Sequence, residues 1–127
     1  MYPYQFVPQN PYLFDYDYLY RQQNGAHRIY NAFQQEHRDL INELQTAGME
    51  QEMVTYIIWT VIQYSLANAN QFSGTINNRT NLLYESLTQQ IQWLPYLFRA
   101  YRLSVNQMRR IVRTIIRFTL QQTGTPM

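Results

Sequence analysis

The chain has 127 residues, of which 46% are hydrophobic, 16% aromatic and 14% charged, and its formal net charge is +2. This length suits one folded domain, and the apolar fraction is large enough for a packed core. The lack of cysteine excludes disulfide frameworks, thiolate metal sites and thiol nucleophiles. Every basic residue is arginine, whose planar guanidinium binds carboxylates or phosphates through two hydrogen bonds. A compositional bias of the genome explains that choice equally well.

Residues 1–25 form a Tyr/Pro-rich arm that contains six of the twelve tyrosines. Pro3, Pro8 and Pro11 exclude a helix in the first eleven residues and favour extended structure. A short helix over residues 11–22 fits the pattern, with proline at its first position. The arm's aromatic side chains need an apolar surface, which either its own domain or a neighbouring subunit supplies. The candidate intersubunit residues are Tyr2, Tyr4, Phe6, Tyr12, Phe14, Tyr16, Tyr18 and Tyr20.

Residues 26–127 are predicted to fold as a helical bundle. In the first helix, positions on one face recur every three or four residues, at Ile29, Phe33, His37, Leu40 and Leu44. Gly48 follows this pattern and is expected to end the helix. The second helix, over residues 49–69, is the most apolar and is expected to lie at the centre. Its apolar stretch, residues 53–66, is shorter than the roughly 20 residues that span a bilayer, so we expect no transmembrane segment.

The third and fourth helices have recognisable ends. Thr75 can cap the third helix, and Pro95 is expected to end or kink it. Ser104 and Gln107 have the spacing of a capping box, which predicts a fourth helix that runs to about Gln122. Four helices with short connections predict an all-α, four-helix-bundle-like domain behind the N-terminal arm.

The last predicted helix concentrates the positive charge. At 100° per residue, Arg109, Arg113 and Arg117 share one face, and apolar residues lie opposite. Residues 99–117 hold six arginines and no acid, a charge of +6, whereas residues 1–98 hold four arginines and eight acids, a charge of −4. The candidate residues for binding nucleic acid or an acidic partner are Arg99, Arg102, Arg109, Arg110, Arg113 and Arg117.

Three interpretations of this arginine face stay open. It is solvated or paired with the acids of its own fold, it contacts a nucleic-acid backbone, or it meets an acidic protein or a membrane surface. Catalysis is not expected. His27 and His37 lie ten residues apart on one predicted helix and point in different directions, and the sequence contains no glycine-rich phosphate loop. We therefore predict a non-enzyme without metal, cofactor or small-molecule substrate, in which Trp59 and Trp93 belong to the core.

A clasping arm and a one-sided charge distribution predict a homo-oligomer or polymer. In layout and composition the chain resembles the all-α, DNA-wrapping coat proteins of filamentous archaeal viruses. The resemblance implies a coat (nucleocapsid) protein that contacts double-stranded DNA. The alternative is a non-viral structural or interaction module, such as a spore-coat-like or scaffold protein, that binds acidic protein surfaces. The residues after Met1 do not resemble a secretory signal, which predicts a location inside the cell or within an assembled particle.

Overall fold

The computed structural model describes the backbone of residues 16–123 and the side chains of residues 25–123. The fold over this part of the chain is all-α, as predicted, and it contains no strand. The helices are α1 (Tyr16–Glu36), α2 (Arg38–Thr46), α3 (Gln51–Asn68), α4 (Ile76–Gln90), α5 (Trp93–Ala100) and α6 (Val105–Gln122). Of the arm residues named above, Tyr2, Tyr4, Phe6, Tyr12 and Phe14 lie outside the described residues, and Tyr16, Tyr18 and Tyr20 lie on α1.

α1 runs through the predicted junction between arm and bundle. It begins at Tyr16 and continues past Asn24 and Gly25, where the sequence indicates a break. Glycine in a helix interior costs about 1 kcal/mol relative to alanine, which is too little to stop a helix that other contacts support. Those contacts come from Ile29 and Phe33, which are buried in the core.

The first predicted bundle helix is divided at His37, which separates α1 from α2. The backbone of His37 has φ −126° and ψ 46°, outside the helical region. Its imidazole stacks on Phe33, with ring centroids 4.7 Å apart, and meets Phe118 of α6 edge-on at 5.5 Å. The change of direction lets α2 follow α6 while Leu40 and Leu44 stay buried. This break and the separate helix α5 account for six helices where four were predicted.

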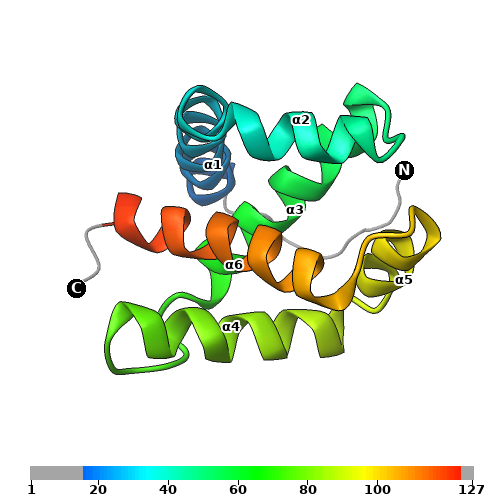
Figure 1. Ribbon diagram of the computed structural model, residues 1–127. Helices are drawn as coiled ribbons and strands as arrows, with labels where there is room; N and C mark the ends of the chain where they lie inside the picture. Colours follow the sequence, from blue (N-terminus) through cyan, green and yellow to red (C-terminus); the bar gives the residue numbers. More distant parts are fainter. Residues whose placement is uncertain (1–15, 124–127) are drawn as a thin grey trace.

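α3 and α6 form the centre of the core. α6 lies in front of α3, with α1 and α2 on one side of it and α4 on the other (Figure 1). On α3, the side chains of Ile57, Ile58, Val61 and Ile62 are fully buried, which confirms the predicted central position of this helix. Gly48, with φ +111°, ends α2 as predicted, and the Met49 N–H donates to the Leu44 carbonyl across that turn.

The predicted role of Pro95 is wrong. α4 ends at Gln90, and Pro95 lies three residues into α5. The first-turn N–H groups of a helix have no partner within it, so proline fits there without the loss of a hydrogen bond. The start of α4 is as predicted, because the Thr75 hydroxyl accepts a hydrogen bond from the Asn78 N–H at 3.2 Å.

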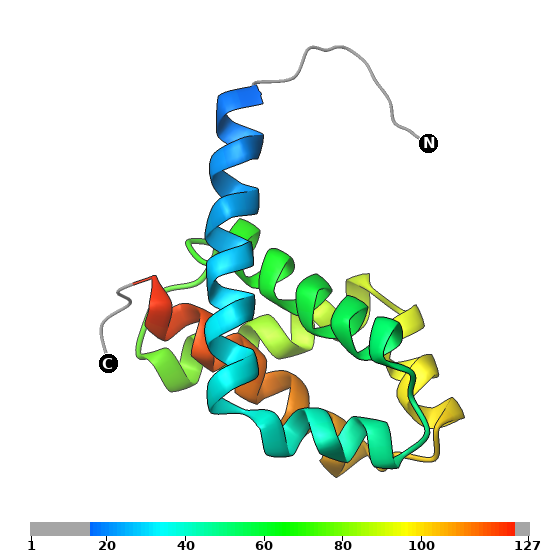
Figure 2. The ribbon, with the colours of Figure 1, turned by 90° about the horizontal axis from the view of Figure 1, so that it is seen from above.

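The N-terminal part of α1 projects beyond the other helices (Figure 2). Among the described side chains of α1, those that pack on the body include Ile29, Phe33 and their buried neighbours in the C-terminal half of the helix. No helix in the described part of the chain combines the length and apolar character that a membrane crossing requires.

Candidate nucleic-acid interface

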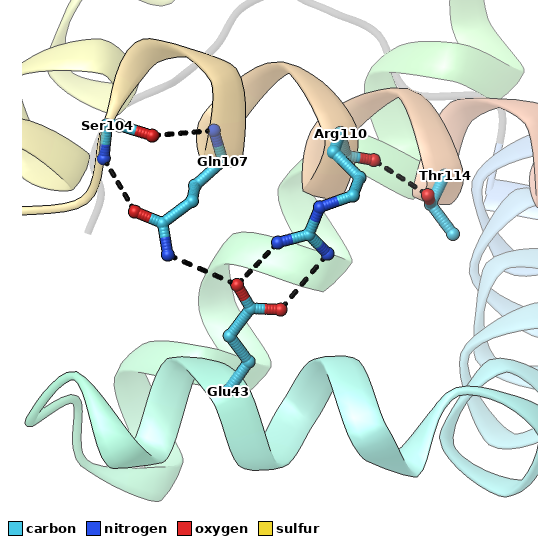
Figure 3. Close-up of polar contacts among 5 residues, drawn as sticks. All are labelled: Glu43, Ser104, Gln107, Arg110 and Thr114. Carbon is cyan, nitrogen blue, oxygen red and sulfur yellow. Dashed lines mark hydrogen bonds and ion pairs between the residues drawn. The ribbon is translucent and has the colours of Figure 1, made fainter.

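The N-terminus of α6 is fixed by the predicted capping box. The Ser104 hydroxyl accepts a hydrogen bond from the Gln107 N–H at 3.0 Å, and the Gln107 side-chain oxygen accepts one from the Ser104 N–H at 2.9 Å (Figure 3). Both contacts satisfy N–H groups that otherwise lack a partner at a helix start. The capping box therefore sets where α6 begins.

The apolar side of α6 is held in the core. Its buried apolar residues are Met108, Ile111, Val112, Ile115, Ile116, Phe118 and Leu120. The Phe118 ring also packs edge-on against Phe33 of α1, with centroids 5.4 Å apart. Because this side cannot rotate without loss of buried area, the opposite side keeps a fixed orientation. The predicted apolar face is buried except for Val105, which is 65% exposed at the first position of the helix.

The arginine stripe consists of three residues of α6, Arg109, Arg113 and Arg117. They lie on successive turns of the helix. Arg109 and Arg117 are exposed, and Arg113 is half-buried. A spacing of four residues places their backbone positions about 6 Å apart along the helix axis. None of the three forms an ion pair with a carboxylate among the described side chains. One interpretation of the arginine face was that acidic residues of the same fold neutralise it. The described part of the chain shows no such ion pair for the stripe.

Tyr84 of α4 borders the stripe, and nothing in the sequence pattern indicates it. The Arg109 guanidinium carbon lies 6.0 Å from the centre of the Tyr84 ring, at the outer limit of a cation–π contact. Burial raises the pKa of Tyr84, and the charges of Arg109 and Arg113 partly offset this increase. Tyr84, which is 8% exposed, is therefore a neutral phenol at physiological pH.

Arg113 is anchored more deeply than its two neighbours on the stripe. Its Nε is buried without a hydrogen-bond partner among the described residues. The residue as a whole is half-buried, so part of it stays accessible to a ligand. The three arginines thus differ in exposure although they share one face.

Arg110 points away from the stripe toward α2. It forms a bidentate ion pair with Glu43, in which Nη2 lies 2.5 Å from Oε2 and Nη1 lies 3.1 Å from Oε1 (Figure 3). Gln107 adds a hydrogen bond to the same carboxylate at 3.3 Å. The hydrogen bond from Arg110 lowers the pKa of Glu43 although burial raises it, and Glu43 in turn raises the pKa of Arg110. Arg110 is therefore partly neutralised within the fold.

Arg99 and Arg102 lie beyond the N-terminal end of α6 and are exposed. Arg102 has φ +63°, and its N–H donates to the Arg99 carbonyl in the turn that ends α5. The structure thus brings three of the six candidate arginines onto one face, turns Arg110 toward α2 and leaves two at one end.

The expectation that Trp93 belongs to the core is wrong. Its side chain is 39% exposed and stacks on Tyr56 of α3, with ring centroids 5.3 Å apart. Trp59 packs against the core as predicted, in edge-on contact with Tyr30.

Neither a metal site nor a known relative gives a further indication of the chemistry. Within the described residues, no group of three or more histidine, aspartate or glutamate side chains is arranged to hold a metal ion. Comparisons of this chain with protein-family models, curated proteins and solved structures gave no match.

Proposed function

We propose that this protein is a self-assembling structural subunit, a coat protein that contacts the phosphates of double-stranded DNA through the arginine stripe. The observation that carries the proposal is the placement of Arg109, Arg113 and Arg117 on successive turns of one helix, without a carboxylate partner among the described side chains. Guanidinium groups contact phosphates in this way without reading base sequence. Such contacts suit a coat protein, which covers whatever sequence it packages.

The stripe also has the rigidity that such a surface needs. α6 is held by its buried apolar side and begins at a capped Ser104, so the backbone positions of the arginines are set before a ligand arrives. Preorganisation reduces the conformational entropy lost on binding. No acidic side chain lies on α6, so no carboxylate of this helix competes with a phosphate for the stripe.

The projecting N-terminal part of α1 supports the assembly half of the proposal. Its N-terminal end lies away from the body that the other helices form (Figure 2). An arm that starts there is placed to reach a second copy. Contacts between different surfaces of identical subunits propagate into open chains unless the rotation closes.

The phosphate contact is tested by titrating a labelled DNA duplex at several salt concentrations. The logarithm of the binding constant falls with the logarithm of salt concentration, with a slope of about −0.9 per neutralised phosphate. The double variant Arg109→Gln/Arg117→Gln should flatten the slope by roughly two such increments. The charge-matched control Arg28→Gln/Arg38→Gln removes two exposed arginines outside α6 and should leave most of the slope intact. Equal losses in both variants would show that net charge alone drives binding.

The same variants distinguish DNA from two other candidate ligands, an acidic protein and a membrane. Polyglutamate, which presents carboxylates, and phosphatidylserine vesicles, which present lipid headgroups, are titrated in place of the duplex. If the stripe is built for a nucleic-acid backbone, the duplex should bind at salt concentrations at which both substitutes have dissociated. Preferential binding of polyglutamate by the stripe would instead support an interaction module for acidic proteins.

A further inference from the structure

A second exposed surface lies at the end of the molecule that carries α5. We define the aromatic patch as three exposed residues, Tyr56 of α3 and Trp93 and Tyr96 of α5. Their exposed fractions are 56%, 39% and 71%, respectively. The Tyr56 and Trp93 rings are nearly parallel, with an interplanar angle of 22°. Tyr96 lies three residues after Trp93 and so shares its side of α5. The patch thus brings three exposed aromatic side chains together at this end of the molecule.

Such a surface is suited to binding rather than to stability. Tyrosine and tryptophan provide large contact areas with few rotatable bonds, and they are enriched where interfaces gain most of their binding free energy. Burial of the remaining exposed ring area would be favourable, and the described part of the subunit leaves it uncovered. The stacking of Tyr56 on Trp93 holds two of the rings in place before a partner arrives.

The arm of this chain has the composition that fits such a patch. Residues 1–15 contain Pro3, Pro8 and Pro11 among tyrosine and phenylalanine side chains. Proline-rich extended segments bind surfaces lined with aromatic rings, because proline rings pack between the aromatic side chains and the restricted backbone loses little entropy. These residues hold one acid, Asp15, and no basic side chain, so ion pairs contribute little to their binding.

The positions of the patch and of α1 favour docking between copies. α1 contacts the C-terminal part of α6, where the Phe33 and Phe118 rings meet, whereas α5 directly precedes the N-terminus of α6. The 18 residues of α6 separate these two ends by about 27 Å. The N-terminal part of α1 also points away from the body (Figure 2). The helix that follows the arm and the helix that carries most of the acceptor therefore contact opposite ends of α6, an arrangement compatible with head-to-tail assembly.

We propose that residues 1–15 of one copy bind the aromatic patch of the next copy, and that this contact builds the polymer. The inference rests on the self-assembly in the proposed function and is independent of the phosphate contact.

Complementation between two full-length variants tests the proposal. Trp93→Ala/Tyr96→Ala removes most of the acceptor, and an arm variant with Tyr2, Tyr4, Phe6 and Tyr12 changed to serine removes the donor. Analytical ultracentrifugation should find polymers for the wild type and monomers for each variant alone. An equimolar mixture should stop at dimers, since only one donor and one acceptor remain. Leu82→Ala, which removes a 40%-exposed leucine from α4, is the control and should polymerise as the wild type does.

The outcomes distinguish this inference from the proposed function. If the wild type polymerises and the patch variant, measured separately, polymerises equally well, the arm–patch contact is wrong. The proposal of self-assembly would still stand in that case. A wild type that stays monomeric at every concentration would contradict both. Circular dichroism should show unchanged helicity in the patch variant, because the rings that it removes are exposed.

Tryptophan fluorescence gives a second readout that does not need the patch variant. In full-length Trp59→Phe, Trp93 is the single tryptophan. Its emission should shift to shorter wavelength as protein concentration rises and polymers form, because the docked arm excludes water from the ring. Polymerisation without such a shift would count against the arm–patch contact.

Discussion

Arg110 and Glu43 connect α6 to α2 through two parallel hydrogen bonds, from Nη2 to Oε2 at 2.5 Å and from Nη1 to Oε1 at 3.1 Å. Sixty-seven residues separate the two in sequence. The pair divides the arginines of α6 into two groups. Arg110 is partly neutralised within the fold, while Arg109, Arg113 and Arg117 keep their charge available for a ligand.

Breaking this ion pair should strengthen DNA binding. Glu43→Gln removes the carboxylate that holds Arg110, so a fourth guanidinium of α6 becomes available to phosphate. We expect a steeper salt dependence, by up to about 0.9 in the slope. Fluorescence anisotropy with a labelled duplex measures it. Glu36→Gln, an exposed glutamate on α1, makes the same change in net charge and should alter the slope much less. Equal slopes in the two variants would mean that Arg110 does not reach the DNA.

The same ion pair should add a small acid-sensitive term to stability. The hydrogen bond from Arg110 lowers the pKa of Glu43 in the folded state, so the pair stabilises the fold above the ordinary glutamate pKa of about 4.3. That contribution is lost as pH falls through the lowered pKa. The side chains of Arg110 and Glu43 are 55% and 27% exposed, so solvent screens the ion pair. Its contribution to the free energy of unfolding is therefore less than about 1 kcal/mol.

Urea unfolding at pH 7 and at pH 3 measures this acid-sensitive term. The difference in unfolding free energy between wild type and Glu43→Gln should be larger at pH 7. A difference that grows on acidification would contradict the assigned pKa shift. Glu36→Gln again serves as the control.

Loss of the α6 cap should destabilise the protein measurably. Ser104→Ala removes the hydroxyl that accepts from the Gln107 N–H, and replacement of such a cap by alanine typically costs about 1 kcal/mol. Thermal or urea unfolding measures it. Ser73→Ala, at an exposed position between α3 and α4, should change stability by less than about 0.5 kcal/mol. Similar effects of both changes would remove the special role assigned to the capping box.

Arg79 of α4 tests whether a buried arginine stabilises through its stem or its charge. Its side chain is 8% exposed, one terminal amino group donates to the Ala69 carbonyl at the end of α3, and its Nε is buried without a partner among the described residues. Arg79→Ala leaves a cavity and should cost about 2–4 kcal/mol. Arg79→Met keeps most of the apolar stem and removes a charge that is costly to bury, so we expect a change below about 1 kcal/mol.

Chemical denaturation of the two Arg79 variants provides the comparison. Equal destabilisation by methionine and alanine would show that the hydrogen bond to the end of α3 matters more than packing. Either variant should leave the salt dependence of DNA binding unchanged, since Arg79 lies outside the stripe.

Features that depend on neighbours along the chain could be predicted from the sequence. Ser104 and Gln107 are three residues apart, and Arg109, Arg113 and Arg117 recur every four, so helix geometry alone sets their relations. Gly48 is another such case, because the end of α2 needs a residue with positive φ.

Features that depend on contacts between distant segments could not be predicted in this way. The break at His37 relies on Phe118, the placement of Tyr84 beside Arg109 relies on the packing of α4 against α6, and neither has a local signal. Trp93 looked like a core residue because tryptophan is usually well buried. Its exposure follows from the docking of the short helix α5 beside Tyr56.

The sequence by itself determined that the chain is helical, where α6 begins, and which side of α6 is charged, because backbone geometry and side-chain periodicity act over a few residues. Only the tertiary structure decided which arginine is paired and which aromatic rings face solvent. Those outcomes depend on how whole helices pack, and packing is set by the shape and burial of side chains that lie far apart in the chain.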